Sequence, residues 1–326
     1  MTAHIDFHRW QDFAFDEHAT WTSPDHRIGF GATQLVASWN ATTPAGTWLE
    51  VELCATTDTG HRTAWYVLGR WASGDTDIRR TSVPGQADAD GAVNVDTFQA
   101  TRTVHAYRLR VTLHQTADAR PELRMVGAMA SAIPDRFTVP AGPPSGADAI
   151  TLPVPAYSQY DHDGGEAWCS PTSTAMVVDY WRGSPSSVDA AARGTYDHAY
   201  GGTGNWPFNT AYAATHGLDA HVTRLRSLAE LESWVRRGVP VITSQSFLAR
   251  ELTGARYDTA GHLMVVVGFT EAGDVVVNDP AAPGVRTVYQ RHQFETVWLR
   301  TRRHLADGSV GGGTGGVGYL IAPPGR

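Results

Sequence analysis

A stretch rich in Pro and Gly, residues 139–149, divides the chain into two parts with different hydrophobic patterns. Such a stretch continues neither a helix nor a sheet and is typical of a linker between domains. The chain has 326 residues, which is more than one hydrophobic core usually holds, so we expect two domains. We predict an accessory domain over residues 1–138 and a second domain over residues 150–326.

Alternating apolar and polar residues dominate the first domain. Residues 49–55 alternate in this way, and residues 108–114 do the same. A period of two is the pattern of a half-buried strand. Further strand-like runs lie at residues 33–39, 63–71, 93–99 and 123–130. Strands at this spacing predict an all-β sandwich, jelly-roll-like in its topology.

Four tryptophans in this first domain allow two interpretations. Trp39, Trp48, Trp65 and Trp71 could form a face on which sugar rings stack, which would make a glycan contact. More often such residues fill the core of a sandwich or an interface between domains, and we favour that interpretation.

Composition excludes several classes of protein. A hydrophobic content of 42% and a charged content of 18% exclude a disordered chain. The net charge is −7 and all 26 basic residues are Arg, which argues against nucleic acid as a partner. No apolar run approaches the roughly 18 residues that span a membrane. The first residues show no secretory signal, so we expect a cytoplasmic protein, with an extracellular one as the alternative.

Cys169 is the residue with the clearest chemical potential. It precedes Pro171 and an apolar run that ends before Gly183, so residues 169–182 are predicted to form a helix that begins at the cysteine. Free N–H groups and the positive end of the helix dipole stabilise a thiolate at this place. The alternative is a small buried structural cysteine, as we expect for Cys54. Two cysteines cannot form a zinc cluster, and we expect neither a metal nor a cofactor.

His262 and Asp279 are candidates for the partners of this thiol. His262 stands at the head of an apolar strand-like run, and a second strand after the turn at 270–273 ends at Asp279. An antiparallel hairpin would bring both residues to the same end, where the histidine acts as base and the carboxylate orients it. The alternatives are a histidine satisfied by a backbone carbonyl and an aspartate that caps the turn before Pro280.

Gln159 precedes the cysteine in a short loop. A side-chain amide, together with the backbone N–H of the nucleophile, can bind the oxyanion of a tetrahedral acyl intermediate. A single loop glutamine carries no information by itself. The order Gln159, Cys169, His262, Asp279 is what gives this residue its weight.

Residues of about 150–322 resemble the C39-like peptidase family of papain-fold cysteine peptidases. The segments that carry the resemblance are Tyr157-Ser158-Gln159, Gly164-Gly165-Glu166-Ala167-Trp168-Cys169-Ser170-Pro171-Thr172, Gly204-Asn205-Trp206-Pro207-Phe208, Gly261-His262-Leu263-Met264-Val265 and Val277-Asn278-Asp279-Pro280. The resemblance implies Cys169 as nucleophile, His262 as base, Asp279 as orienting carboxylate and Gln159 as oxyanion donor. One departure is the loop between Gln159 and Cys169, which is shorter than in relatives of the family.

The expected protein is therefore an α+β papain-like domain preceded by the β-sandwich. Its expected function is that of a cysteine peptidase or amidase that cleaves a peptide amide through a Cys169 thioester, with a peptide or protein as substrate. Two alternatives stay open. One is acyl transfer to an acceptor other than water, and the other is a non-catalytic protein that binds glycan or peptide through the sandwich.

Overall fold

The computed structural model describes residues 3–75 and 78–326. The chain divides into two compact units. The N-terminal unit consists of residues 4–132 and 192–222, and the C-terminal unit consists of residues 133–191 and 223–326 together with Ala3. The first is mainly an antiparallel sheet and the second combines helices with another antiparallel sheet, which confirms the α+β class.

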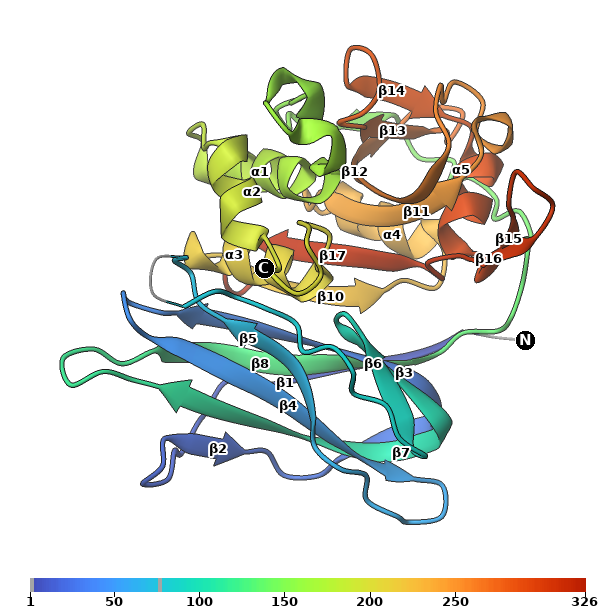
Figure 1. Cartoon of the computed structure of the whole chain (residues 1–326). Coiled ribbons are helices and arrows are strands. Elements are labelled where there is room, and N and C mark those ends of the chain that lie inside the picture. The colour runs from blue at the N-terminus through green and yellow to red at the C-terminus, as the bar shows by residue number, and fades with distance from the viewer. Residues whose placement is uncertain (1–2, 76–77) are drawn as a thin grey trace. The chain divides into compact units, whose positions relative to one another are not determined.

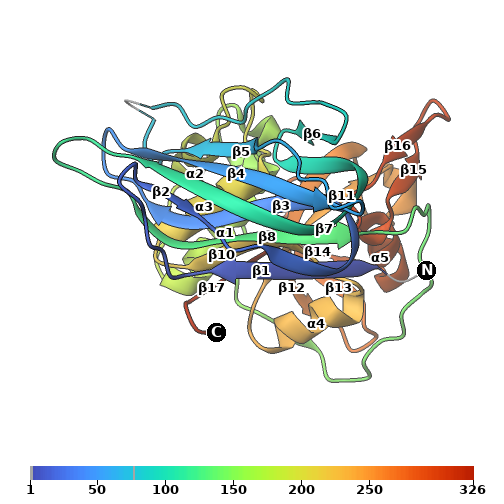
Figure 2. The same ribbon diagram turned by 90° about the horizontal axis from the view of Figure 1, so that it is seen from below.

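Long antiparallel strands build the N-terminal unit, and Figures 1 and 2 show them side by side. They are β1 (His4–Trp10), β2 (Thr20–Thr22), β3 (His26–Thr42), β4 (Trp48–Thr57), β5 (Tyr66–Trp71), β6 (Gly91–Asn94), β7 (Thr97–His114) and β8 (Glu122–Ala132). The order in the sheet is β1-β8-β3-β7-β4-β5, with β2 and β6 also paired to β7. Register shifts interrupt β3 where it pairs with β7, so these long strands bend and the sheet curves around an apolar interior.

The predicted strand over residues 93–99 is wrong, because a tight turn interrupts it. β6 ends at Asn94 and β7 begins at Thr97, and the two pair with each other. Val95 adopts a φ of +57°, a left-handed conformation that suits a two-residue hairpin turn but is unusual for a β-branched residue. The apolar pattern alone did not reveal this turn.

The N-terminal unit includes helix α3 (Trp206–Thr215), which comes from much later in the sequence. Phe208 on α3 lies against the rings of Trp39 and Trp71, with ring centroids 6.1 Å and 5.5 Å away. Trp39 and Trp71 are fully buried, so these two tryptophans belong to the core, as favoured above. Trp65 lies beneath the guanidinium of Arg110.

A second antiparallel sheet forms the centre of the C-terminal unit (Figure 1). Its order is β10-β17-β11-β12-β13-β14, with β9 also paired to β12. The strands are β9 (Ile150–Thr151), β10 (Asp219–Arg224), β11 (Val241–Phe247), β12 (Thr259–Phe269), β13 (Val275–Asn278), β14 (Arg286–Tyr289) and β17 (Val317–Ala322), and β15 (Arg302–His304) pairs separately with β16 (Val310–Gly312). The helices are α1 (Cys169–Arg182), α2 (Val188–Thr195), α4 (Leu228–Arg236) and α5 (Arg291–Leu299), with short 3-10 turns η1 (Gln159–Asp161), η2 (Gly165–Ala167) and η3 (Ala249–Glu251). The division between the two units falls within α2 and β10.

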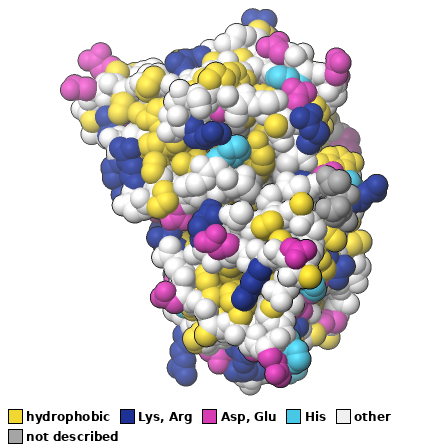
Figure 3. Space-filling view, turned by 90° about the vertical axis from the view of Figure 1, so that its left-hand side faces the viewer, with side chains coloured by type: hydrophobic (Ala, Val, Ile, Leu, Met, Phe, Trp, Pro, Cys, Tyr) yellow, Lys and Arg dark blue, Asp and Glu magenta, His cyan; other side chains and the backbone are white. Residues whose placement is uncertain are grey.

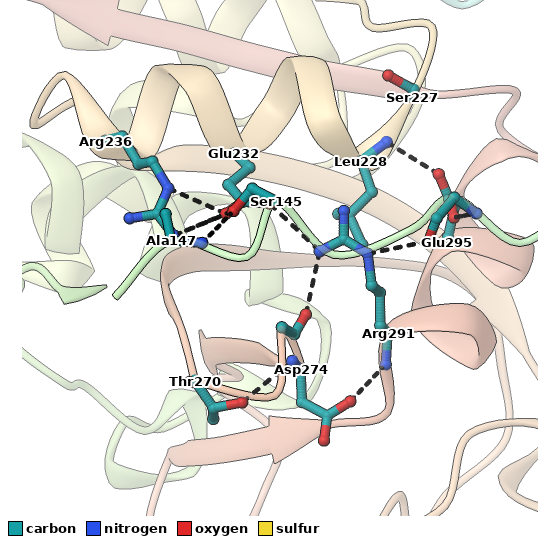
Figure 4. A network of polar contacts seen from close by, with 12 residues as sticks. Ser145, Ala147, Ser227, Leu228, Glu232, Arg236, Thr270, Asp274, Arg291 and Glu295 are labelled. Atoms are coloured by element: carbon teal, nitrogen blue, oxygen red, sulfur yellow. Dashed lines mark hydrogen bonds and ion pairs between the residues drawn. The ribbon is translucent and has the colours of Figure 1, made fainter. Parts of the chain in front are cut away.

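A network of buried charges ties the predicted linker to the C-terminal unit (Figure 4). Glu232 on α4 pairs with Arg236 at 2.7 Å and with Arg291 at 3.3 Å, and it accepts a hydrogen bond from Ser145. Arg291 in turn donates from its backbone N–H to Asp274 at 3.0 Å. Glu232 and Arg291 are both buried, so each needs the other's charge. Residues around 145 therefore follow a defined path along this unit.

The helices and the surface have two general features. Over the residues described, no helix is both long enough and apolar enough to cross a membrane. On the face drawn in Figure 3, Arg side chains lie among Asp, Glu and apolar side chains and form no broad basic area.

Candidate active site

Helix α1 begins at Cys169, as the sequence predicts. The N-cap residue Trp168 offers no side-chain hydrogen bond to the helix, and the helix ends at Gly183, which has a φ of +65°. Because no side chain caps this N-terminus, its N–H groups can act on the cysteine sulfur. Two polar contacts hold the first turns against the sheet: Ser173 Oγ donates to the Leu263 carbonyl on β12 at 3.1 Å, and Ser170 Oγ lies 3.0 Å from the hydroxyl of Tyr319 on β17.

These contacts bring Cys169 to the start of β12, where its side chain is hydrogen-bonded to His262. The sulfur also accepts hydrogen bonds from the backbone N–H groups of Leu263 and Ser170. Burial alone would raise the pKa of this thiol, but the histidine and the two N–H groups outweigh it and lower the pKa below its ordinary value. Cys169 stays partly exposed, so a substrate can reach it.

His262 connects the thiol to Asp279. Its Nε2 lies 2.7 Å from Asp279 Oδ1, which leaves Nδ1 for Cys169. The side chains meet because β12 and β13 are antiparallel, with Val265 opposite Asn278, so Asp279, which directly follows β13, lies near the part of β12 that carries His262. Burial would lower the pKa of His262, but the Asp279 carboxylate and the hydrogen bonds to Asp279 and Cys169 raise it instead. A lowered thiol pKa beside a raised imidazole pKa favours a thiolate–imidazolium pair.

Asp279 has further partners that the sequence did not reveal. The hydroxyls of Tyr257 and Tyr289 both donate to its Oδ2, at 2.7 Å and 2.8 Å, and the Ala281 N–H donates to Oδ1 at 3.0 Å. Asp279 is fully buried. Burial would raise its pKa, but His262 and the two tyrosine hydroxyls lower it below the ordinary value. No local motif marks either tyrosine, because each reaches Asp279 through the folding of a separate segment.

Gln159 lies at the start of η1 and is held from two sides. Its backbone N–H donates to the Pro280 carbonyl at 3.0 Å, and its Nε2 donates to the Glu166 carbonyl at 2.8 Å. The side chain is 2% exposed. Within residues 3–75 and 78–326, no donor reaches its Oε1. Gln159 is therefore bonded both to the turn after Asp279 and to η2, the segment that leads into Cys169. An amide nitrogen carries two hydrogens, so one Nε2 hydrogen takes no part in the bond to Glu166.

Two family profiles match the sequence over most of its length. Residues 151–305 match the profile described as the Peptidase C39 like family, and residues 3–131 match the profile described as the Peptidase C39 N-terminal domain. Residues 151–305 therefore form a domain of the C39-like peptidase family. This agrees with the resemblance seen in the sequence and with a papain-like cysteine peptidase fold. A comparison with curated proteins finds no match.

Solved structures similar to parts of this chain include three from different sources. A C39-like peptidase from Bacillus anthracis is 18% identical, with 55% of this chain and 100% of that chain covered and a TM-score of 0.38. The SPBc2 prophage-derived protein YomS is 11% identical over 40% of this chain and 96% of its own, with a TM-score of 0.22. The structure of infectious bursal disease virus Gt strain is 12% identical over 39% of this chain and 32% of its own, with a TM-score of 0.22.

A hollow of about 430 Å³ opens beside the two loops that carry Gln159 and Asp279 in this C39-like domain. Residues of the Gln159 loop line one wall and residues after Asp279 line the other: Ala156, Ser158, Tyr160, Asp161, Ala281, Ala282, Pro283, Gly284 and Val285. Small side chains leave this space open, and Tyr160 is 58% exposed at its rim. A recess beside these two loops could take part of a substrate.

The other cysteine of the chain lies in different surroundings. Cys54, on β4 of the N-terminal unit, is buried and its Sγ lies 3.3 Å from the Thr63 carbonyl. Burial raises the pKa of this thiol above its ordinary value, so it is a poor nucleophile. Among the residues that the structure describes, no group of three or more His, Cys, Asp or Glu side chains could hold a metal ion.

Proposed function

We propose that this protein is a cysteine peptidase that hydrolyses a peptide amide through a thioester on Cys169. The observation that carries the proposal is the hydrogen bond between Cys169 and His262, with a lowered thiol pKa and a raised imidazole pKa. This pair supplies a thiolate at neutral pH together with a proton for the leaving group, which are the two requirements for acyl transfer from an amide.

In the first half of the reaction, Cys169 Sγ attacks the substrate carbonyl carbon and the carbonyl electrons move to the oxygen. The oxyanion is bound by the Cys169 N–H and by Gln159 Nε2. When the intermediate collapses, the C–N bond breaks and the imidazolium of His262 gives its Nδ1 proton to the leaving amine. The products of this half are a free amine, a Cys169 thioester and a neutral histidine.

In the second half, a water molecule attacks the thioester while His262 takes one of its protons at Nδ1. Collapse of the second intermediate breaks the C–S bond, releases a carboxylic acid and restores the thiolate–imidazolium pair. Asp279, bonded to His262 Nε2 at 2.7 Å, stabilises the charged ring in the resting enzyme and keeps it aimed at the sulfur throughout.

A peptide library incubated with the full chain tests this proposal, with products identified by mass spectrometry. We expect new carboxyl and amino termini that disappear in Cys169→Ala and are unchanged in Cys54→Ala. Adding a primary amine separates hydrolysis from acyl transfer, because a transferase would form the new amide in place of the free acid. Peptide cleavage that persists in Cys169→Ala would overturn the proposal.

A further inference from the structure

The two tyrosines that bind Asp279 come from different segments of the C-terminal unit. Tyr257 precedes β12, whereas Tyr289 is the last residue of β14, where it lies opposite Val275 of β13. Both hydroxyls nevertheless donate to the same oxygen, Oδ2, at 2.7 Å and 2.8 Å. The other oxygen, Oδ1, accepts from His262 and from the Ala281 N–H. Each carboxylate oxygen therefore has its own set of donors.

This division prevents the carboxylate from turning about its bond to Cβ. If the group rotated, Oδ1 would lose the histidine and Oδ2 would lose two hydroxyls at once, because four donors converge on it from four positions in the chain. The ring of Tyr257 also lies edge-on to the ring of His262, with centroids 5.3 Å apart and planes at 71°. Tyr257 thus contacts both members of the His–Asp pair.

We propose that Tyr257 and Tyr289 are positioning residues that act together through Asp279 Oδ2 and hold Oδ1 on His262 Nε2, so that the imidazolium faces Cys169. The effect of the two tyrosines on turnover rests on the proposed function. Their effect on the thiol does not, because the reactivity of Cys169 depends on the alignment of the His262 ring whether or not a peptide is cleaved.

Electrostatics supports such a role. The titratable groups that act on Asp279 are His262, Tyr257 and Tyr289, and Cys169 lies beyond His262. Burial, followed by the charge of Asp279, raises the pKa of both tyrosines above the ordinary value. Both phenols therefore stay protonated, and stay donors, throughout the pH range in which a thiolate–imidazolium pair exists.

Removing one hydroxyl has a predictable sign. Asp279 then loses a donor to its charged form, so its pKa rises. At the low-pH edge His262 is still protonated, so this edge reports the pKa of the Cys169 thiol; with Oδ1 held less firmly, the imidazolium faces the sulfur less well and the thiol pKa rises toward its ordinary value. The low-pH edge of Cys169 reactivity therefore moves to higher pH, by about one unit for one hydrogen bond to a charged group.

The test measures the rate at which iodoacetamide alkylates Cys169 as a function of pH in the full chain, with Cys54 as an internal reference. We expect Tyr289→Phe and Tyr257→Phe each to move the low-pH edge upward by about one unit. Tyr157→Phe is the matched control, because the hydroxyl of Tyr157 donates to another buried carboxylate, Asp179, at 2.8 Å. Its profile should superimpose on that of the wild type.

Thermal unfolding of each variant distinguishes a positioning role of the hydroxyl from a role in fold stability alone. A structural role predicts a lower Tm in all three variants with no shift in the alkylation profile, and that result would overturn the inference. Single variants keep one hydroxyl on Oδ2, so they decide the matter even where the double variant fails to fold. If the wild type cleaves no peptide but the low-pH edge of alkylation still shifts in the tyrosine variants, the proposed function fails and this inference stands. If the wild type cleaves peptides but the edge does not shift in these variants, this inference fails and the proposed function stands.

Discussion

Replacing Gln159 by Ala tests one step of the proposed reaction, the binding of the oxyanion. The substitution removes the side-chain amide but leaves the backbone N–H that donates to the Pro280 carbonyl, so the loop keeps its anchor. If the amide binds the oxyanion, kcat should fall about 10²-fold, which corresponds to roughly 2.7 kcal/mol of transition-state stabilisation. KM should change little, because the bond forms mainly in the transition state.

The variant should remain folded, because the Gln159 side chain makes few hydrogen bonds that the substitution would remove. Its side-chain amide donates from Nε2 to the Glu166 carbonyl at 2.8 Å. The cost to folding is small. One hydrogen bond is lost, worth about 1 kcal/mol, while an acceptor without a partner, Oε1, is removed from a buried place. The variant should therefore fold, and its kcat should be measurable.

The assay compares kcat and KM of wild type and variant on a cleaved peptide, with the concentration of active enzyme counted by labelling of Cys169. Gln86→Ala is the control. Its amide donates to the Val67 carbonyl at 2.8 Å in the N-terminal unit, so its loss affects stability without touching the site. If Gln159→Ala keeps the kcat of the wild type, Gln159 is not the donor and the reasoning from its two anchors is wrong.

Four further outcomes are expected. Between about pH 6 and 7, iodoacetamide should alkylate Cys169 much faster than Cys54, because one thiol has a lowered pKa and the other a raised pKa; equal labelling, read by peptide mass spectrometry, would contradict this. Asp279→Asn should lower kcat by about 10²-fold or more, since the imidazolium loses its counter-charge, and its alkylation profile should lose the plateau at neutral pH. Ala282→Trp should raise KM for peptides by filling the hollow beside Gln159 while leaving the alkylation rate of Cys169 unchanged; an unchanged KM would place the substrate elsewhere. Glu232→Ala should destabilise the C-terminal unit by about 3–5 kcal/mol, because the buried Arg291 loses a partner. The pKa of Glu232 is lowered in the folded protein, so this stabilisation is present above the ordinary carboxyl pKa and is lost as the pH falls through the pKa of the folded state. Denaturant titrations of wild type and variant at several pH values measure both effects.

Much of the scaffold around the site follows from local patterns. The helix that begins at Cys169 and ends before Gly183 was predictable, because Pro171 suits a first turn and Gly183 can adopt the left-handed conformation found there. The hairpin of β12 and β13 was predictable from two apolar runs around a short turn. In each case the residues next to one another in the sequence are enough to predict the element.

Other features were not visible in the hydrophobic pattern. The turn at Val95 interrupts a run that alternates as a strand would. Helix α3 depends on contacts with segments far away in the chain, because it belongs with the N-terminal unit although its sequence stands among residues of the peptidase profile. Burial of Phe208 against Trp39 and Trp71 accounts for that placement, and a hydrophobic pattern gives no information about which distant surface a side chain will meet.

The sequence by itself determined the α+β class, the family, and four chemically suited residues in a meaningful order. Only the tertiary structure decided how those residues are supported: which backbone N–H groups reach the Cys169 sulfur, which carbonyl holds the Gln159 amide, and that Tyr257 and Tyr289 share one oxygen of Asp279. The physical reason is that helix and strand propensities act over a few neighbouring residues, whereas hydrogen bonds to a buried carboxylate are satisfied by whatever donors the packing of the sheet brings to it.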